Sequence, residues 1–387
     1  MKNTALFSLG FRPFFLLACL WSGLAMVLWL GMLGGVMTVP TALDPASWHA
    51  HEMLFGYLSA VLGGFLLTAV PNWTGRPPLK GAGLVALVAL WLAGRGAVFL
   101  SVHLPPLMVG LVDLSFMVVL VFYLGREIVA GKNWRNLAVV AMLSLFIVAN
   151  AIFHLEADQG EYAAGGFGFR LGLGVAIMLI SLIGGRIVPA FTQNWLRQQR
   201  VPVPPVFAPQ FDLVTMLVSG AALLAWVAFG LTEIVAWGLL LMGLMQAARL
   251  LRWQGHVSGR EPLVWILHVG YGFVPLGAIA LGLSGVQPQL SDVLSAQHFW
   301  MAGAIGVMTM AVMTRASLGH SGQALRAGAG TISIYSFLIL AVFVRIIGSY
   351  VGDLSLTFYS LSALFWCVGY FGFVVLYGPA LLRPRNG

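Results

Sequence analysis

Long apolar runs alternate with short polar stretches along the whole chain. Each run has about 17–25 residues, the length that an α-helix needs to cross the hydrocarbon core of a bilayer. Turn-forming segments such as PNWTGRPP, GKN and VPVPP fall between the runs. The pattern predicts twelve membrane spans, at residues 14–37, 53–70, 83–102, 106–127, 137–154, 170–189, 211–229, 234–253, 263–283, 298–314, 331–349 and 356–381.

These spans predict an all-α polytopic membrane protein, built as one integral membrane domain over residues 1–387. The longest inner connection, at about 190–210, separates the first six spans from the last six, and no convincing sequence repeat relates the two halves. The first apolar run is too long for the apolar region of a signal peptide. We therefore interpret it as an uncleaved first span.

Composition supports the same class of protein. The chain is 60% hydrophobic and 8% charged, whereas soluble domains carry about 25% charged residues. The net charge of +8 does not indicate nucleic-acid binding, because the basic residues lie in short loops and form no basic soluble face. Cys19 and Cys367 lie inside apolar runs and form no CxxC pair, which argues against iron–sulfur clusters and covalently attached haem.

Basic residues mark one side of the membrane. Alternate loops hold 17 of the 20 lysines and arginines, from Lys2 to Arg385, and the remaining loops are acidic or neutral. Because positively charged loops stay in the cytoplasm, this alternation predicts that both termini are cytoplasmic. Basic loops of this kind also contact anionic lipid headgroups of the surrounding bilayer.

Histidines gather toward the outer side of the predicted bundle. Five of the eight lie there, namely His49, His51, His103, His154 and His298. His268 lies inside the ninth span near its inner end, and His256 and His320 lie in or near inner loops. Each could form an interhelical hydrogen bond or lie at the headgroup level. Imidazole is also a common ligand of iron, copper and zinc, so the outer cluster is a candidate haem or metal site.

The segment WHAHEM at the start of the second span concentrates this chemistry. On a helix, His49 and His51 would point about 200° apart, so we expect them to serve different centres or different roles. Glu52 could orient an imidazole, bind a metal, carry a proton in catalysis, or complement the dipole of a helix N-terminus.

Three arginines lie outside the inner loops. Arg95 and Arg345 fall in the outer halves of their spans, and Arg170 lies at an outer end. Such arginines could bind haem propionates. The alternative is that they pair with acidic residues of the chain itself, the candidates being Asp113, Glu161 and Asp353.

Several long motifs resemble those of the NnrS family of bacterial inner-membrane proteins. They are GFRPFF near the start, WHAHEMLFGY followed by GGFLLTAVPNWTGRPPL, GGRIVPAFTQNWL at 184–196, WILHVGY at 265–271 and AIGVMTMAVMTRASLGHSG at 304–322. The resemblance covers nearly the whole chain. It implies a twelve-span protein that contains haem b and copper and is associated with denitrification and resistance to nitric oxide.

The resemblance also implies a set of site residues. It carries over to His49, His51, Glu52, His154, His268, His298 and His320, whereas His103 and His256 fall in stretches without resemblance. His298 and His320 would lie about 33 Å apart on one continuous helix. They therefore predict two centres or a role for His320 other than ligation.

We therefore expect a haem and copper protein that binds or turns over nitric oxide. The candidate metal ligands are His49, His51, His154 and His298; the candidate cofactor-binding residues add His268, His320, Arg95 and Arg345; and Glu52 is the candidate catalytic residue. Turnover would need electrons from quinol or a periplasmic donor. The alternatives are a membrane transporter whose histidines relay protons or bind metal in transit, and a haem or metal delivery protein.

Overall fold

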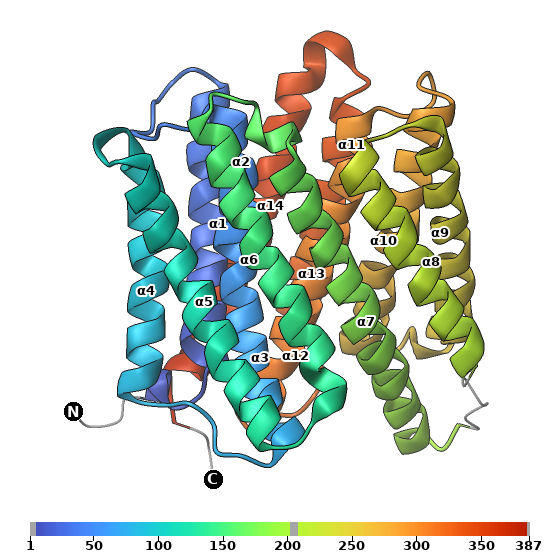
Figure 1. Cartoon of the computed structure of the whole chain (residues 1–387). Helices are drawn as coiled ribbons and strands as arrows, with labels where there is room; N and C mark the ends of the chain where they lie inside the picture. The colour runs from blue at the N-terminus through green and yellow to red at the C-terminus, as the bar shows by residue number, and fades with distance from the viewer. Residues whose placement is uncertain (1–4, 202–207, 385–387) are drawn as a thin grey trace. The chain divides into compact units, whose positions relative to one another are not determined.

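The computed structural model describes residues 5–201 and 208–384, and within these ranges the chain is helical and without strands. Twelve helices are long and apolar enough to cross a membrane (Figure 1). The predicted all-α polytopic architecture is thus confirmed. The spans are α1 (Phe11–Leu33), α2 to α3 (Pro45–Thr74), α4 (Ala82–Phe99), α5 (Pro106–Ala130), η4 and α6 (Trp134–Asp158), α7 (Phe167–Gln198), α8 (Pro209–Phe229), α9 (Glu233–Arg252), α10 (Pro262–Val286), α11 to α12 (Val293–His320), α13 (Ala329–Gly348) and η8 with α14 (Gly352–Leu382).

Three spans extend furthest beyond their predicted lengths. The second begins at Pro45, so WHAHEM lies inside the helix and not at its mouth. The tenth begins at Val293, upstream of His298. Helix α7 continues to Gln198, which shortens the predicted loop at 190–210. Residues 202–207 of that loop, and the basic residues Lys2 and Arg385, lie outside the described parts of the chain.

Aspartates explain the early starts of the second and tenth spans. Asp44 Oδ1 accepts hydrogen bonds from the backbone N–H groups of Ala46 and Ser47, both at 3.0 Å. Asp292 Oδ2 accepts one from Ser295 at 2.8 Å. Such caps satisfy the donors that a helix leaves unpaired in its first turn. The apolar pattern alone does not reveal these turns, because they are polar.

The same two spans change their helical winding directly after a histidine. Helix α2 (Pro45–His51) ends at His51 and is followed by a π-helical segment, η2 (Glu52–Tyr57), and by α3 (Leu58–Thr74). Helix α11 (Val293–His298) ends at His298 and is followed by the π-helical segment η7 (Phe299–Val307) and by α12 (Met308–His320). π-helical turns are rare and occur frequently at functional sites.

The contacts divide the chain into two compact units. Unit 1 comprises residues 1–175, 316–324 and 366–387, and unit 2 comprises residues 176–315 and 325–365. Within unit 1, α4 and α5 form an antiparallel pair, and α5 also packs on α3 and on α6 (Leu137–Asp158) (Figure 1).

Unit 1 turns apolar side chains outward and some of its polar ones inward. Leu107 and Phe122 of α5 are each 75% exposed, whereas Asp113 on the same helix is buried. At the other end of the unit, the Arg12 guanidinium donates to the Leu381 carbonyl at 3.0 Å. The first and last spans therefore have these ends together, as expected for a chain that crosses the membrane an even number of times.

Candidate metal centre

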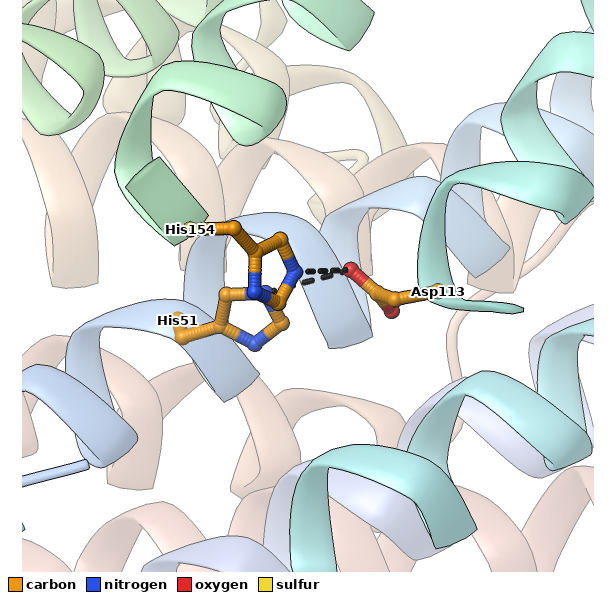
Figure 2. A group of neighbouring side chains, drawn as sticks. All are labelled: His51, Asp113 and His154. Carbon is orange, nitrogen blue, oxygen red and sulfur yellow. Dashed lines mark hydrogen bonds and ion pairs between the residues drawn. The ribbon is translucent and has the colours of Figure 1, made fainter. Parts of the chain in front are cut away.

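His51, Asp113 and His154 form a compact group inside unit 1 (Figure 2). They come from α2, α5 and α6, and one ligand atom of each lies within 4.8 Å of the others. His51 and Asp113 are buried and His154 is nearly so. The group thus gathers two imidazoles and a carboxylate from three different spans in an otherwise apolar interior.

Both nitrogens of the His51 ring face oxygen atoms. Nδ1 donates to Glu52 Oε1 at 3.0 Å. Nε2 lies 3.2 Å from Asp113 Oδ2 and 3.1 Å from Asn150 Oδ1. A neutral imidazole has a lone pair on one nitrogen, and here that lone pair would point at oxygens. The geometry therefore requires a cation at Nε2, either a proton or a metal ion.

Asp113 is the hub of the cluster. Its Oδ2 atom accepts from Asn150 Nδ2 at 2.7 Å and lies 3.1 Å from His154 Nε2, as the dashed line in Figure 2 shows. Its Oδ1 atom accepts from the Arg95 guanidinium. Both carboxylate oxygens thus accept hydrogen bonds, which hold the side chain in one orientation.

Arg95 joins Asp113 to Glu52. Arg95 Nη1 lies 2.6 Å from each of the two Glu52 oxygens, and Nη2 contacts Asp113. Trp21 Nε1 donates to Glu52 Oε2 at 2.6 Å. Charge-assisted contacts of this kind are the strong hydrogen bonds of proteins. Of the two roles predicted for Arg95, the structure therefore shows pairing with a carboxylate of the chain.

Glycines make room for this ion-pair network. A Cβ at Gly56 would lie 2.6 Å from Arg95 Nη1 and 2.8 Å from Glu52 Oε2. A Cβ at Gly94 would lie 3.0 Å from Asp113 Oδ1. The guanidinium and the carboxylates thus approach the helix backbones more closely than a side chain would allow.

Aromatic rings enclose the cluster on one side. The rings of Phe55 and Phe153 lie 5.5 and 5.4 Å from the His51 ring, centroid to centroid. The His154 ring lies 5.0 Å from that of His51. These apolar neighbours exclude bulk water, so electrostatic interactions within the cluster are stronger than at a surface.

The donor set fits a metal ion. Two imidazoles and one carboxylate are ligands that suit copper, iron and zinc. A ligating histidine usually donates its other N–H to a carboxylate or a carbonyl, and His51 does so to Glu52. With both carboxylates ionised, their two negative charges face only one guanidinium, which favours an additional cation.

The same cluster does not fit a haem. The cavity beside it has a volume of about 10 Å³, which is room for about one water molecule, and His51 is in contact with rings on several sides. A macrocycle would displace these side chains. Any haem of this chain would therefore need a different location from the His51–Asp113–His154 group.

His49 lies apart from this group although it is two residues from His51. Its ring stacks on Trp29, with centroids 4.7 Å apart and planes 16° apart. The two histidines thus contact different neighbours. Sequence reasoning placed both among the metal ligands, and the structure brings only His51 and His154 of that set together with a carboxylate.

The other predicted histidines have local surroundings of their own. His298 Nδ1 donates to the Leu294 carbonyl at 2.7 Å. His268 Nε2 donates to Thr192 Oγ1 at 2.8 Å, because that hydroxyl donates its own hydrogen to Val188. The His320 ring lies 5.5 Å from that of Phe11, in the GFRPFF motif.

Two predicted arginines are held by groups other than the acidic residues that sequence suggested. Arg345 lies over the ring of Tyr359 at 4.2 Å and donates to Ser349 Oγ at 3.0 Å. Arg170 donates to the Gly165 carbonyl at 2.7 Å. The contacts that hold these two arginines are therefore with Tyr359, Ser349 and Gly165, and not with the suggested Asp353 and Glu161.

Sequence reasoning missed Asp113 and Asn150 as site residues. From the sequence, Asp113 is a candidate only as a possible partner of an arginine, and Asn150 is not a candidate. A signal for Asp113 existed, because an ionisable residue within a membrane span is by default a functional candidate. Asn150 lies four residues before His154, one helical turn away on the same face, so the pair could have been read together.

Unit 2 has a buried polar network of its own, centred on Arg249. The guanidinium donates to Asp212 Oδ1, to the Ser181 carbonyl and to Tyr271 Oη, each at 3.0 Å. A Cβ at Gly185 would clash with it. All its oxygen acceptors are groups of the chain, and we interpret this network as structural.

The comparisons with known proteins agree with the motifs. The model of the family described as NnrS protein matches residues 5–385. No curated protein matches the chain. Because the match covers nearly the whole sequence, including every residue of the cluster around Asp113, the chain belongs to the NnrS family.

Proposed function

We propose that this chain binds nitric oxide within a bacterial inner membrane, at a copper ion held by His51, Asp113 and His154. The observation that carries the proposal is the Nε2 atom of His51, which faces oxygens of Asp113 and Asn150 and therefore calls for a cation. Nitric oxide partitions into apolar surroundings, and the cluster lies within the apolar interior of unit 1.

Each residue has a distinct part in the proposed site. Bound copper would supply the electron exchange and the open coordination position that nitric oxide needs. His51 and His154 would be nitrogen ligands and Asp113 the oxygen ligand. Glu52 accepts the Nδ1 proton of His51 and so fixes the ring and its tautomer. Arg95 forms ion pairs with both Glu52 and Asp113 and so fixes the positions of the two carboxylates.

We also propose haem b, at a second centre whose iron His298 would hold. His298 donates Nδ1–H to the Leu294 carbonyl at 2.7 Å. A second contact of this type is typical of metal-bound histidines. Electrons for any turnover would come from quinol or a periplasmic donor, and both termini would be cytoplasmic, as the charged loops predict.

The experiment is a cofactor inventory of the purified protein. Wild type should contain copper and haem, with a Soret band that shifts when nitric oxide is added. His51→Ala and His154→Ala should lose copper and keep haem, and His298→Ala should lose haem and keep copper. His103→Ala is the matched control and should keep both, because His103 ends the short segment Ser101–His103 and is not one of the three clustered residues.

The outcomes distinguish the alternatives. A colourless wild-type protein without metal would exclude the proposal and favour a transporter. Copper or haem that is lost on washing would favour a delivery role. If copper remained bound in both His51→Ala and His154→Ala, the assignment of the ligands would be wrong.

A further inference from the structure

A small cavity adjoins the Asp113 cluster within unit 1. Its volume is about 10 Å³, which is room for about one very small molecule. Most of its wall is apolar, and its polar side is formed by Ser59, Arg95, Asp113 and Asn150. The Ser59 hydroxyl donates its hydrogen to the Gly56 carbonyl at 2.9 Å.

Most polar groups on this side of the cavity already have hydrogen-bond partners, so few of them remain for a water molecule. The oxygens of Asp113 already accept from Arg95, Asn150 and His154. Arg95 Nε is buried and has no hydrogen-bond partner among the described residues. A buried water typically makes about three hydrogen bonds, whereas Arg95 is the one residue lining this cavity with a buried side-chain nitrogen or oxygen that has no partner among the described residues.

We propose that this cavity is a docking site for a diatomic gas, whose electronegative end accepts a hydrogen bond from Arg95 Nε. Such a molecule is small, mostly apolar and needs at most one weak hydrogen bond, so it matches the cavity in size and polarity. This inference deepens the proposed function, since the gas would be nitric oxide, and Asp113 is both a cavity wall and a proposed metal ligand.

The wall toward the lipid is thin. Leu114 on α5 and Ile147 on α6 line the cavity and are also partly exposed at the outer surface of unit 1. Helices α5 and α6 pack directly on each other (Figure 1). We infer that a gas dissolved in the bilayer would enter past the Leu114 and Ile147 side chains.

The test uses krypton as a probe, because it is monatomic, apolar and independent of any metal. Crystals of the full chain are pressurised with krypton with and without added copper, and copper content is measured separately. Wild type should show a krypton peak in the cavity in both states. Ile147→Trp should abolish the peak, and Met117→Phe is a second filling variant in case the first does not fold.

A matched control is available on the same helix. Leu145 is 46% exposed and does not line the cavity, so Leu145→Trp should retain the krypton peak. Wild-type crystals with an ordered water on Arg95 Nε that krypton does not displace would overturn the proposal. So would an undiminished peak in a folded filling variant.

The result separates this inference from the proposed copper site. A krypton peak in a protein that binds no copper would support the cavity while the proposed function failed. Copper binding without a krypton peak would support the proposed copper site, and the proposal for the cavity would fail. In the copper-loaded protein, Ile147→Trp should lower the affinity for nitric oxide at least tenfold with copper content unchanged.

Discussion

His51 and His154 lie with their rings 5.0 Å apart and direct their Nε2 atoms at the same oxygen of Asp113. One oxygen between two imidazoles is an arrangement that a cation can complete, because each of the three groups can supply a lone pair to it. The two histidines are 103 positions apart in the sequence and belong to the second and fifth spans. They lie close together because the second and fifth spans are brought near each other by the packing of unit 1.

Asp113→Asn should reduce copper binding at least about tenfold, since it removes an anionic ligand while keeping the shape of the side chain. Copper content after dialysis at a fixed free-copper concentration measures the effect. Asp353→Asn, in the short η8 segment outside the cluster, is the control. Equal copper content in both variants would show that Asp113 is not a ligand.

Arg95→Gln should destabilise unit 1 by about 3–5 kcal/mol, because it leaves two buried carboxylates without their cation. Thermal unfolding in detergent measures the loss. Arg95→Lys should recover only part of it, since an ammonium group cannot bridge both carboxylates with the planar geometry of a guanidinium. Arg95→Gln combined with Glu52→Gln should be less harmful than the sum of the two changes; simple additivity would argue against coupling.

Gly56→Ala should disturb the same ion pairs without removing any charge. The new Cβ would lie within 3 Å of both Arg95 Nη1 and Glu52 Oε2, and overpacking of this kind costs about 1–3 kcal/mol. Gly96→Ala is an exacting control, because Gly96 is adjacent to Arg95 on α4 and its Cβ would meet nothing within 4 Å. Similar melting temperatures for the two variants would contradict the close packing at Gly56.

Gly185→Ala should destabilise unit 2 through Arg249, again by about 1–3 kcal/mol, and should leave copper content unchanged. The prediction follows because the Arg249 network and the Asp113 cluster have no residue in common. Gly220→Ala, whose Cβ would meet only Met178 at 3.6 Å, should have little effect. Loss of copper in Gly185→Ala would show that unit 2 supports the metal site, contrary to this expectation.

The sequence was sufficient to predict the spans. Twelve apolar runs are a property of each segment taken alone, and lipid enforces it because an unpaired backbone group cannot stay in hydrocarbon. The starts of the second and tenth spans were predicted too late, because the capped turns after Asp44 and Asp292 are polar and read as loops.

For the candidate site, the sequence indicates some of the residues but not how they are grouped, and the physical reason is a different one. His51, His154 and Glu52 are candidates from the sequence because ionisable residues in apolar runs are conspicuous. Their grouping around Asp113 depends on the rotation of α5 and α6 about their axes, which periodicity does not determine. The π-helical segment at 52–57 adds to the problem, since it changes the angle at which every following side chain leaves the helix.

The Arg95–Asp113 pair also bears on how the protein enters the membrane. A charged residue at the centre of a lone helix costs about 2.5–3.5 kcal/mol to insert. Arg95, toward the end of α4, and Asp113, toward the start of α5, would each bear part of that cost if its helix were inserted alone. Helices α4 and α5 are consecutive and antiparallel, with a short connection between them (Figure 1). We therefore expect the translocon to release them into lipid together, as a helical hairpin whose charges neutralise each other before the rest of the bundle assembles.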